Sequence, residues 1–323
     1  MYPFIFEPIL KEIIWGGKDI RLFKGLPPGD DKIGESWELS HVEGNCSVVA
    51  NGASAGQTID DLVENFGAAL LGKKVLQQFG KRFPLLIKFI DAQDDLSIQV
   101  HPDDELAQKR HHSFGKTEMW YVIKATRGAA LYSGFSRRIN ADEYMRYIAN
   151  NSFTDVLHRY EVTAGDVFFL PAGRVHAIGA GCFIAEIQQT SNITYRIYDY
   201  NRRDANGNAR ELHVEQAKDA IDYTPYPDCR TSYVPAENRP VELVRCKYFT
   251  TCLLSVDKAM KRDFASLDSF VVHILTEGSA VIRDDCGNEL SVRQGQTILI
   301  PAATQWVEII PSPHAKLLET CVR

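Results

Sequence analysis

The sequence predicts a mainly β protein, built from two related β-barrels with a small helical part. Short strand-like runs fill most of the chain, and turn residues separate them. One segment near the middle of the chain is repeated near its end, which indicates two copies of one barrel unit. Helical spacing of apolar residues is confined to three stretches, so helices are the minor component.

The composition is that of a globular protein with room for two domains. The 323 residues are 45% hydrophobic and 24% charged, with a net charge of −6. This acidic balance does not favour nucleic-acid binding, which usually needs a basic face. No apolar run approaches the length of a membrane span, and charges interrupt the apolar N-terminus, unlike a secretory signal. The seven cysteines are scattered without a CxxC pair, so we expect reduced thiols and a cytoplasmic location.

The first part of the chain alternates strand and helix patterns. Residues 1–55 read as short strands and turns, and residues 58–80 change to helical spacing. Thr58 and Asp61 have the spacing of a capping box at the start of this helical stretch. Strand-like runs then return at residues 85–92 and 96–100.

The middle and last parts complete two domains. A second helical pattern begins at Asn140, and a third covers residues 213–221. Strands are expected at residues 116–122, 165–171, 182–189 and 194–198. Prolines between residues 225 and 240 indicate a linker, after which nearly all segments are short strands. We therefore expect a catalytic domain over residues 1–235 and a second barrel over residues 236–323.

The internal repeat assigns different roles to the two barrels. GDVFFLPAGRVHAI at residues 165–178 aligns without gaps with GQTILIPAATQWVE at residues 295–308. The second copy has Trp306 where the first has His176. We interpret the first barrel as the one that retains chemistry, and the second as structural and without a metal site.

Polar side chains with metal-binding atoms share the faces of two predicted strands. Ser97, Gln99 and His101 point to one side of the first strand because side chains alternate along a strand. Lys116 and Glu118 share a face on the second. Amide, imidazole and carboxylate groups suit Zn²⁺, although Fe²⁺ or Mn²⁺ would also fit this set.

The segment around His176 fits the second sequence motif of cupins. Gly165, Pro171, Gly173 and His176 have the required spacing. The first cupin motif is altered, since Gln99 replaces its first histidine and Glu118 follows an inserted loop.

This departure is shared with one family. QVHPDD, KTEMWYV, LPAGRVHAI and AEIQQTSNITYRIYDYNR occur in this order and resemble type I mannose-6-phosphate isomerase (phosphomannose isomerase), in its short bacterial form. The resemblance implies two cupin-type jelly-roll barrels and one Zn²⁺ per chain. It implies the zinc ligands Gln99, His101, Glu118 and His176, an active-site arginine at Arg196, and the pocket residues Lys116, Glu186, Ser97 and Lys88.

The activity that this resemblance implies is interconversion of mannose 6-phosphate and fructose 6-phosphate by proton transfer through an enediolate. Arg196 is expected to stabilise the oxyanion. Glu186 is a candidate base or an orienting group for Arg196, and Lys116 a candidate acid or base. Ser97 and Lys88 are expected to bind substrate, and Arg202 or Arg203 could reach the phosphate. The expected partner is a phosphorylated hexose, with no nucleic acid or membrane, for a monomer or homodimer.

Two other classes of protein remain open at this stage. A cupin oxygenase with Fe²⁺ would use a similar site, but such sites usually have more histidine and need open positions for O₂. A non-catalytic sugar-binding cupin would not need Lys116 and Arg196 beside the ligand set. Metal analysis together with an oxygen-uptake assay distinguishes the oxygenase from the isomerase.

Overall fold

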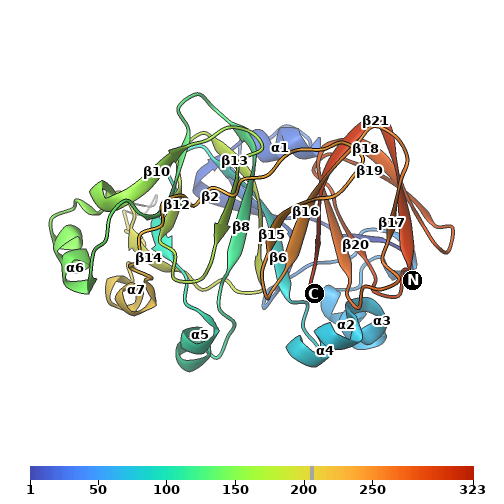
Figure 1. The fold of residues 1–323 in the computed structure, drawn as a ribbon, viewed down its shortest axis with the longest axis horizontal. Coiled ribbons are helices and arrows are strands. Elements are labelled where there is room, and N and C mark those ends of the chain that lie inside the picture. The colour runs from blue at the N-terminus through green and yellow to red at the C-terminus, as the bar shows by residue number, and fades with distance from the viewer. Residues whose placement is uncertain (204–206) are drawn as a thin grey trace.

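The computed structural model describes residues 1–203 and 207–323, which form three main β-sheets with helices around them (Figure 1). Two sheets face each other in the N-terminal part, and the third belongs to the C-terminal part. A small hairpin of β4 (His41–Val42) and β5 (Asn45–Cys46) stands apart from them. The mainly β class predicted from the sequence is confirmed.

The first sheet has six strands and contains the most buried segments of the chain. Its order is β11 (Val167–Leu170), β8 (Glu118–Ala125), β13 (Cys182–Gln189), β6 (Leu85–Ala92), β2 (Ile9–Gly17) and β3 (Ile33–Leu39). Every residue of β6 and β13 is buried. Both strands are therefore long apolar runs, and their few charged side chains must find partners inside the protein.

The second sheet has five strands and faces the first. Its order is β10 (Leu157–Glu161), β9 (Ala130–Phe135), β12 (His176–Ile178), β7 (Ile98–Val100) and β14 (Tyr195–Tyr198). The two sheets share no strand pairing in the described residues, so they form an open, cupin-like sandwich. The sequence predicts closed barrels, and this detail is corrected: the strands are present, but their edges do not close.

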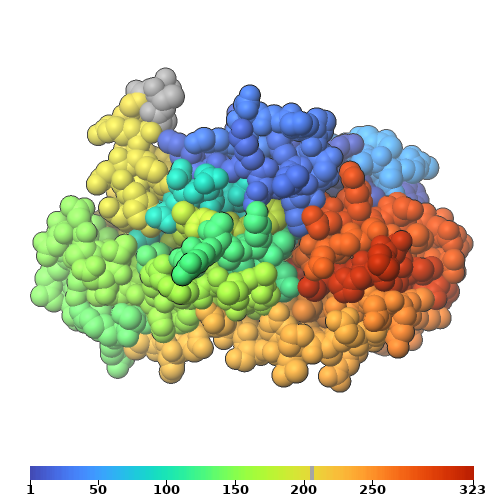
Figure 2. All heavy atoms as spheres, turned by 90° about the horizontal axis from the view of Figure 1, so that it is seen from above, coloured from blue at the N-terminus to red at the C-terminus, as the bar shows by residue number. Residues whose placement is uncertain are grey.

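The third sheet has eight strands and takes its first strand from the N-terminus. Its main order is β1 (Phe4–Ile5), β20 (Thr297–Ile300), β18 (Val271–Asp284), β21 (Trp306–Cys321), β16 (Thr250–Val256) and β15 (Val241–Arg245), while β17 (Met260–Asp263) pairs with β21 and β19 (Glu289–Arg293) with β18. Phe4 is paired with Leu299. Figure 2 shows the N-terminal segment, in blue, lying between the green and red halves of the molecule.

The helices lie at the ends of the sheets. They are α1 (Asp19–Lys24), α2 (Ile59–Phe66), α3 (Ala68–Leu71), α4 (Lys73–Phe79), α5 (Asp104–His111), α6 (Ala141–Ala149) and α7 (Val214–Ala220), with 3-10 turns at Gly52–Ser54 and Phe153–Val156. The predicted capping box of Thr58 and Asp61 is confirmed at α2. The helical stretch at 58–80 is divided into three because Gly67 and Gly72 have positive φ angles of 46° and 96°. None of the described helices is long and apolar enough to cross a membrane.

Helix α5 was not predicted, because its sequence has no apolar periodicity. The sequence instead predicts a turn or cap at Asp103 and Asp104 and a polar loop over residues 109–116. In the structure Asp103 caps the helix, since its side chain accepts a hydrogen bond from the Leu106 N–H at 2.8 Å. Capping and surface charge therefore define α5, rather than an apolar stripe.

The internal repeat is matched by the structure. The strands β11 and β20 begin at Val167 and Thr297, two residues after Gly165 and Gly295. Both glycines have positive φ angles, 94° and 82°. The strands that follow begin at His176 and Trp306, the two aligned residues. All seven cysteines are free thiols, as their spacing predicts.

Replacing Thr58 by alanine should lower the free energy of unfolding by about 1 kcal/mol, because the α2 cap loses its side-chain acceptor. Urea unfolding measures this change. Thr58→Ser is the matched control, since it keeps the hydroxyl. An equal loss in the serine variant would show that the threonine methyl group, and not the cap, is responsible.

Candidate active site

The space between the two facing sheets of the N-terminal sandwich collects most of the predicted site residues. On the five-stranded sheet, Gln99 is the cross-strand neighbour of His176 on one side and of Arg196 on the other. His101 follows directly after β7. The register of three short strands thus places an amide, an imidazole and a guanidinium group in one row.

The six-stranded sheet supplies the opposite wall. Glu118 is the first residue of β8, and Gln188 of β13 is its cross-strand neighbour. Glu186, two residues earlier on β13, is paired with Lys88 of β6. Alternation along β13 therefore directs Glu186 and Gln188 to the same face as Glu118.

His101, Glu118 and His176 converge at one buried point. One ligand atom from each residue lies within 4.8 Å of the other two. The distances are 3.4 Å from His101 Nε2 to Glu118 Oε2, and 3.2 Å from His176 Nε2 to Glu118 Oε1. This cluster unites residues from two different sheets, as the predicted metal set requires.

Backbone carbonyls orient both imidazoles toward the cluster. His101 Nδ1 lies 2.9 Å from the carbonyl oxygen of Ile193, and His176 Nδ1 lies 2.8 Å from that of Arg174. A carbonyl can only accept, so each Nδ1 carries the proton and each Nε2 presents a lone pair. Burial lowers the pKa of His101 to about 3 and also lowers the pKa of His176, which keeps both rings neutral.

The Glu118 carboxylate is held ionised inside this cluster. Burial by itself raises its pKa, but Lys116 and the two neighbouring histidines together outweigh burial and hold the pKa well below its usual range. Lys116 Nζ lies 2.9 Å from Glu118 Oε2 and 2.9 Å from His101 Nε2. Even so, neither carboxylate oxygen accepts a well-directed hydrogen bond from the described residues. Lone pairs of two nitrogens and a carboxylate thus converge on a point that favours a cation.

Gln99 lies at the edge of the cluster. Its Nε2 is 3.2 Å from His176 Nε2, so in this arrangement the amide donates to the imidazole. A half-turn about the terminal bond of the side chain would present the amide oxygen instead. Gln99 therefore lies beside His176, and its role as a fourth ligand stays a prediction.

A second charged cluster adjoins the first. Lys88 Nζ lies 3.3 Å from Glu186 Oε1 and 3.5 Å from Glu35 Oε2. Burial by itself lowers the pKa of Lys88, but these two carboxylates outweigh it and raise that pKa. Burial and the charge of Glu118 raise the pKa of Glu186. The Trp120 indole N–H donates to Glu186 Oε2 at 2.9 Å, so Trp120 both packs and orients this carboxylate.

Sequence reasoning missed Glu35 and Ser133. Glu35 lies in β3, where its segment gave only a strand pattern, and no local motif pointed to Lys88. Ser133 is the cross-strand neighbour of His176 and has a buried hydroxyl without a partner among the described residues. The alternation of side chains along β9 predicts that Ser133 lies on the same face as Leu131. It does not predict that Ser133 lies opposite His176.

Arg196 and Ser97 lie together, while Arg202 and Arg203 bond to other partners. Arg196 Nε donates to Ser97 Oγ at 3.3 Å and its Nη1 donates to the Glu211 carbonyl at 3.0 Å. Arg202 is held by Asp199 and the carbonyl of Asp95, and Arg203 donates to the Gly207 carbonyl at 2.7 Å. The structure thus brings Arg196 and Ser97 to the row of Gln99, whereas Arg202 and Arg203 make their hydrogen bonds to other groups.

Comparison with known proteins shows which family this chain resembles. Residues 4–121 match the family described as phosphomannose isomerase type I, catalytic domain. The mannose-6-phosphate isomerase ManA of Bacillus subtilis is 38% identical over 251 residues, covering 77% of this chain and 78% of that protein. The probable mannose-6-phosphate isomerase GmuF of the same organism is 33% identical over 309 residues, covering 93% of this chain and 94% of that one.

The chain belongs to the type I phosphomannose isomerase family.

The fold agrees with this membership. The crystal structure of the mannose 6-phosphate isomerase from Bacillus subtilis superimposes with a TM-score of 0.87 at 30% identity, covering 99% of both chains. The chain is the short form of the family, as its sequence predicts. The converging donor set therefore occurs in a phosphomannose isomerase fold and not in an unrelated sandwich.

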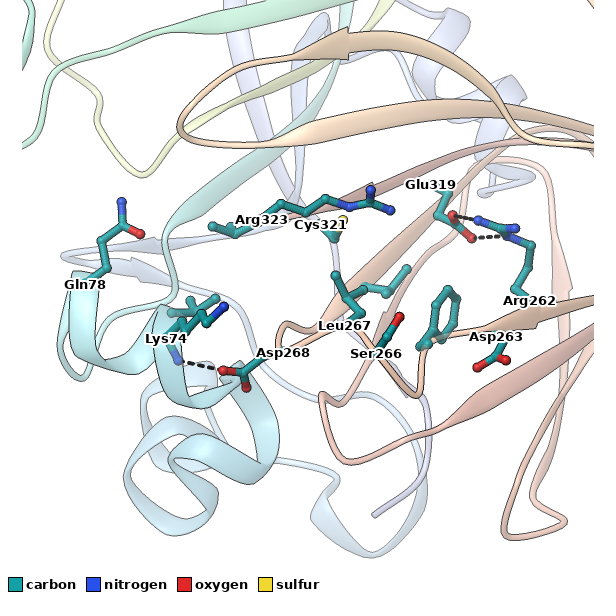
Figure 3. A pocket seen from close by; sticks show the side chains of 14 residues that line it. Lys74, Gln78, Arg262, Asp263, Ser266, Leu267, Asp268, Glu319, Cys321 and Arg323 are labelled. Carbon is teal, nitrogen blue, oxygen red and sulfur yellow. Dashed lines mark hydrogen bonds and ion pairs between the residues drawn. The ribbon is translucent and has the colours of Figure 1, made fainter.

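The C-terminal part has a hollow of its own, shown in Figure 3. It measures about 340 Å³ and lies between α4 and the strands β17, β18 and β21. The charged groups there neutralise each other, since Arg262 donates twice to Glu319, at 3.0 and 2.6 Å. His273 also contacts Glu319, at 3.1 Å. In the described residues this hollow has no cluster of candidate metal ligands comparable to the one around Glu118.

His101→Ala should abolish stoichiometric metal binding, because it removes one of the three converging donor atoms. Metal content per chain, measured by mass spectrometry of the purified protein, tests this. His112→Asn is a matched control, since His112 is exposed, lies outside the cluster and has a positive φ of 51° that asparagine tolerates. Full occupancy in the His101 variant would exclude the assigned site.

Proposed function

We propose that the protein is a zinc-dependent aldose–ketose isomerase that interconverts mannose 6-phosphate and fructose 6-phosphate. The observation that carries this proposal is the convergence of His101, Glu118 and His176 on one buried point, with Lys116 beside it. The membership of the chain in the type I phosphomannose isomerase family supports the substrate pair.

The donor set suits one divalent ion, held by His101, Glu118, His176 and the amide of Gln99. Two neutral imidazoles, a carboxylate and an amide oxygen are ligands that Zn²⁺ accepts. When bound, such an ion supplies Lewis-acid polarisation of the substrate oxygens. The burial of all three charged or imidazole ligands excludes bulk water from this point.

The residues of the chain supply the proton transfer. Isomerisation removes a proton from C2 of the aldose and returns one to C1, while a proton moves between the two oxygens. Glu186 is buried with a raised pKa, which suits a group that accepts and returns a proton. Lys116 lies where it can exchange a proton with a substrate oxygen near Glu118.

Charge on the reacting oxygens needs a fixed cation. Arg196 keeps its guanidinium charge and lies in the row of Gln99 and His176. Ser97 orients it through the contact with Nε. We infer that Arg196 stabilises the enediolate oxygen, and that Ser97 and Lys88 contact the sugar phosphate.

The division of labour between the two parts of the chain belongs to this proposal. Residues 1–235 contain all the proposed site residues, and residues 236–323 form the second cupin-like unit. The two are not independent folding units, because β1 is a strand of the C-terminal sheet. Seven free thiols suit a reducing compartment such as the cytoplasm.

One observation supports a second candidate. Two histidines and one carboxylate also form the donor set of non-haem Fe²⁺ oxygenases. Here the Lys116 ammonium lies 2.9 Å from both His101 Nε2 and Glu118 Oε2. A cation this close occupies space that an oxygenase leaves open for O₂. Family membership also favours the isomerase.

The purified protein should convert mannose 6-phosphate to fructose 6-phosphate in a coupled assay, and a chelator should abolish the activity. Readdition of Zn²⁺ should restore it. Oxygen uptake with Fe²⁺ serves as the comparison. Activity that survives complete metal removal would contradict the zinc proposal, and absence of isomerisation in the metal-loaded protein would contradict the function.

Arg196→Ala should lower kcat by about 100-fold or more with the metal still bound, because it removes a preorganised cation from the developing charge. Arg196→Lys tests whether charge alone is enough, since lysine lacks the planar group of donors. Steady-state kinetics and metal content are measured on the same samples. An unchanged kcat in the alanine variant would remove Arg196 from the mechanism.

A further inference from the structure

The carboxylate of Asp104 lies at the junction of the two halves of the molecule. Asp104 is the first residue of α5, but the capping role belongs to its neighbour Asp103. Its Oδ1 accepts from the Gly115 N–H at 3.0 Å and from Gln189 Nε2 at 2.9 Å. Its Oδ2 accepts from the Tyr248 hydroxyl at 2.5 Å and from Lys247 Nζ at 3.2 Å. One carboxylate thus joins two donors of the N-terminal part to two of the C-terminal part.

From Asp104 the contacts lead to the backbone between two site residues. Gln189 Oε1 accepts from the Thr117 N–H at 2.8 Å, and the Gln189 N–H donates to the Thr117 carbonyl at 3.1 Å. Thr117 stands between Lys116 and Glu118. Its hydroxyl also accepts from the Ala172 N–H at 3.2 Å, in the turn that leads to His176.

The position of Thr117 explains why this support is needed. The ladders of β8 with β11 and with β13 both end at Glu118. Lys116 and Thr117 therefore lie beyond the regular sheet hydrogen bonds, and other partners must hold their backbone. The Gln189 side chain, fixed by Asp104, is the partner of the Thr117 N–H.

Of the two contacts that the C-terminal part makes with Asp104, the one from Tyr248 is stronger than the one from Lys247, because Tyr248 is more buried. Tyr248 is 8% exposed and belongs to the apolar core that both halves share. The Lys247 side chain is 70% exposed, so solvent screens its contact with Asp104. A hydrogen bond from a hydroxyl to an ionised carboxylate is short and stronger than one between neutral groups.

We propose that Asp104, Gln189 and Tyr248 are positioning residues for the active site. They hold Thr117 so that Lys116 and Glu118 face His101, and through Tyr248 the C-terminal unit takes part in catalysis. The second unit is then more than a structural copy of the first. The proposal rests on the proposed function, because the groups it positions are the acid or base and the metal ligand assigned above.

The test compares Tyr248→Phe with Tyr233→Phe in the full-length protein. Both changes remove one tyrosine hydroxyl, but the Tyr233 hydroxyl donates to the Gly165 carbonyl at 2.7 Å, away from the site. Tyr248→Phe should lower kcat and weaken Zn²⁺ binding by up to about tenfold, the lower end of the effect of direct partners of metal ligands, because Tyr248 acts through Asp104 and Gln189, and the KM for the sugar phosphate should be unchanged. Tyr233→Phe should leave all three values as in the wild type.

A second pair of variants separates positioning from stability. Asp104→Ala removes all four contacts and should reduce kcat at least as much as Tyr248→Phe. Asp104→Asn keeps an acceptor for Gly115 and Gln189 and should recover most of the activity. Equal activity of Asp104→Ala, Asp104→Asn and the wild type would overturn the proposal, as would equal losses in the alanine and asparagine variants.

Amide hydrogen exchange makes the test independent of the isomerase assay. The Thr117 amide should exchange about tenfold faster in Tyr248→Phe and in Asp104→Ala than in the wild type or in Tyr233→Phe. If the wild type fails to isomerise mannose 6-phosphate, the proposed function fails, and the exchange rate alone decides the positioning claim. Unchanged exchange at Thr117 in both variants would overturn it.

Discussion

The carboxylate of Glu118 is wholly buried and faces two imidazole nitrogens that carry lone pairs. An unpaired charge at such depth would cost several kcal/mol, so the surrounding structure must compensate for it. Lys116 provides one positive charge, and a divalent ion bound by the same atoms would provide more. In the neighbouring cluster of Lys88, Glu186 and Glu35, the buried ammonium group is compensated in the same way by two carboxylates. Much of the interior of the sandwich is arranged around these buried charges.

The sandwich provides the two walls that this arrangement needs. One sheet contributes the row of His176, Gln99 and Arg196, and the other contributes Glu118, Glu186 and Lys88. Because side chains alternate along each strand, the residues that adjoin these groups in the chain, such as Ile87, Met119 and Ile187, point into the core on the other face. A register shift of one residue would bury the charges in the apolar core, so packing and chemistry enforce the same register.

Prediction from sequence worked best where a local pattern carried the information. The strands β6 and β13, the capped helix α2 and the repeated segment at Gly165 and Gly295 all follow from periodicity or turn residues. Helix α5 and the partners Glu35 and Ser133 could not be found in this way. The roles of Glu35 and Ser133 depend on residues far away in the chain. Helix α5 was missed because it lacks an apolar stripe.

The order of motifs in the chain was enough to name the family, and it predicted which residues would bind the metal, because ligand chemistry and strand alternation are local properties. The packing of the two sheets decided which lone pairs face each other. It also decided which carboxylate has a raised pKa and which one is left without a directed hydrogen-bond donor. The contact of Tyr248 with Asp104 likewise exists only after the C-terminal sheet has packed against the sandwich. Local sequence specifies the chemical groups, whereas their distances and charges depend on contacts between segments that are remote along the chain.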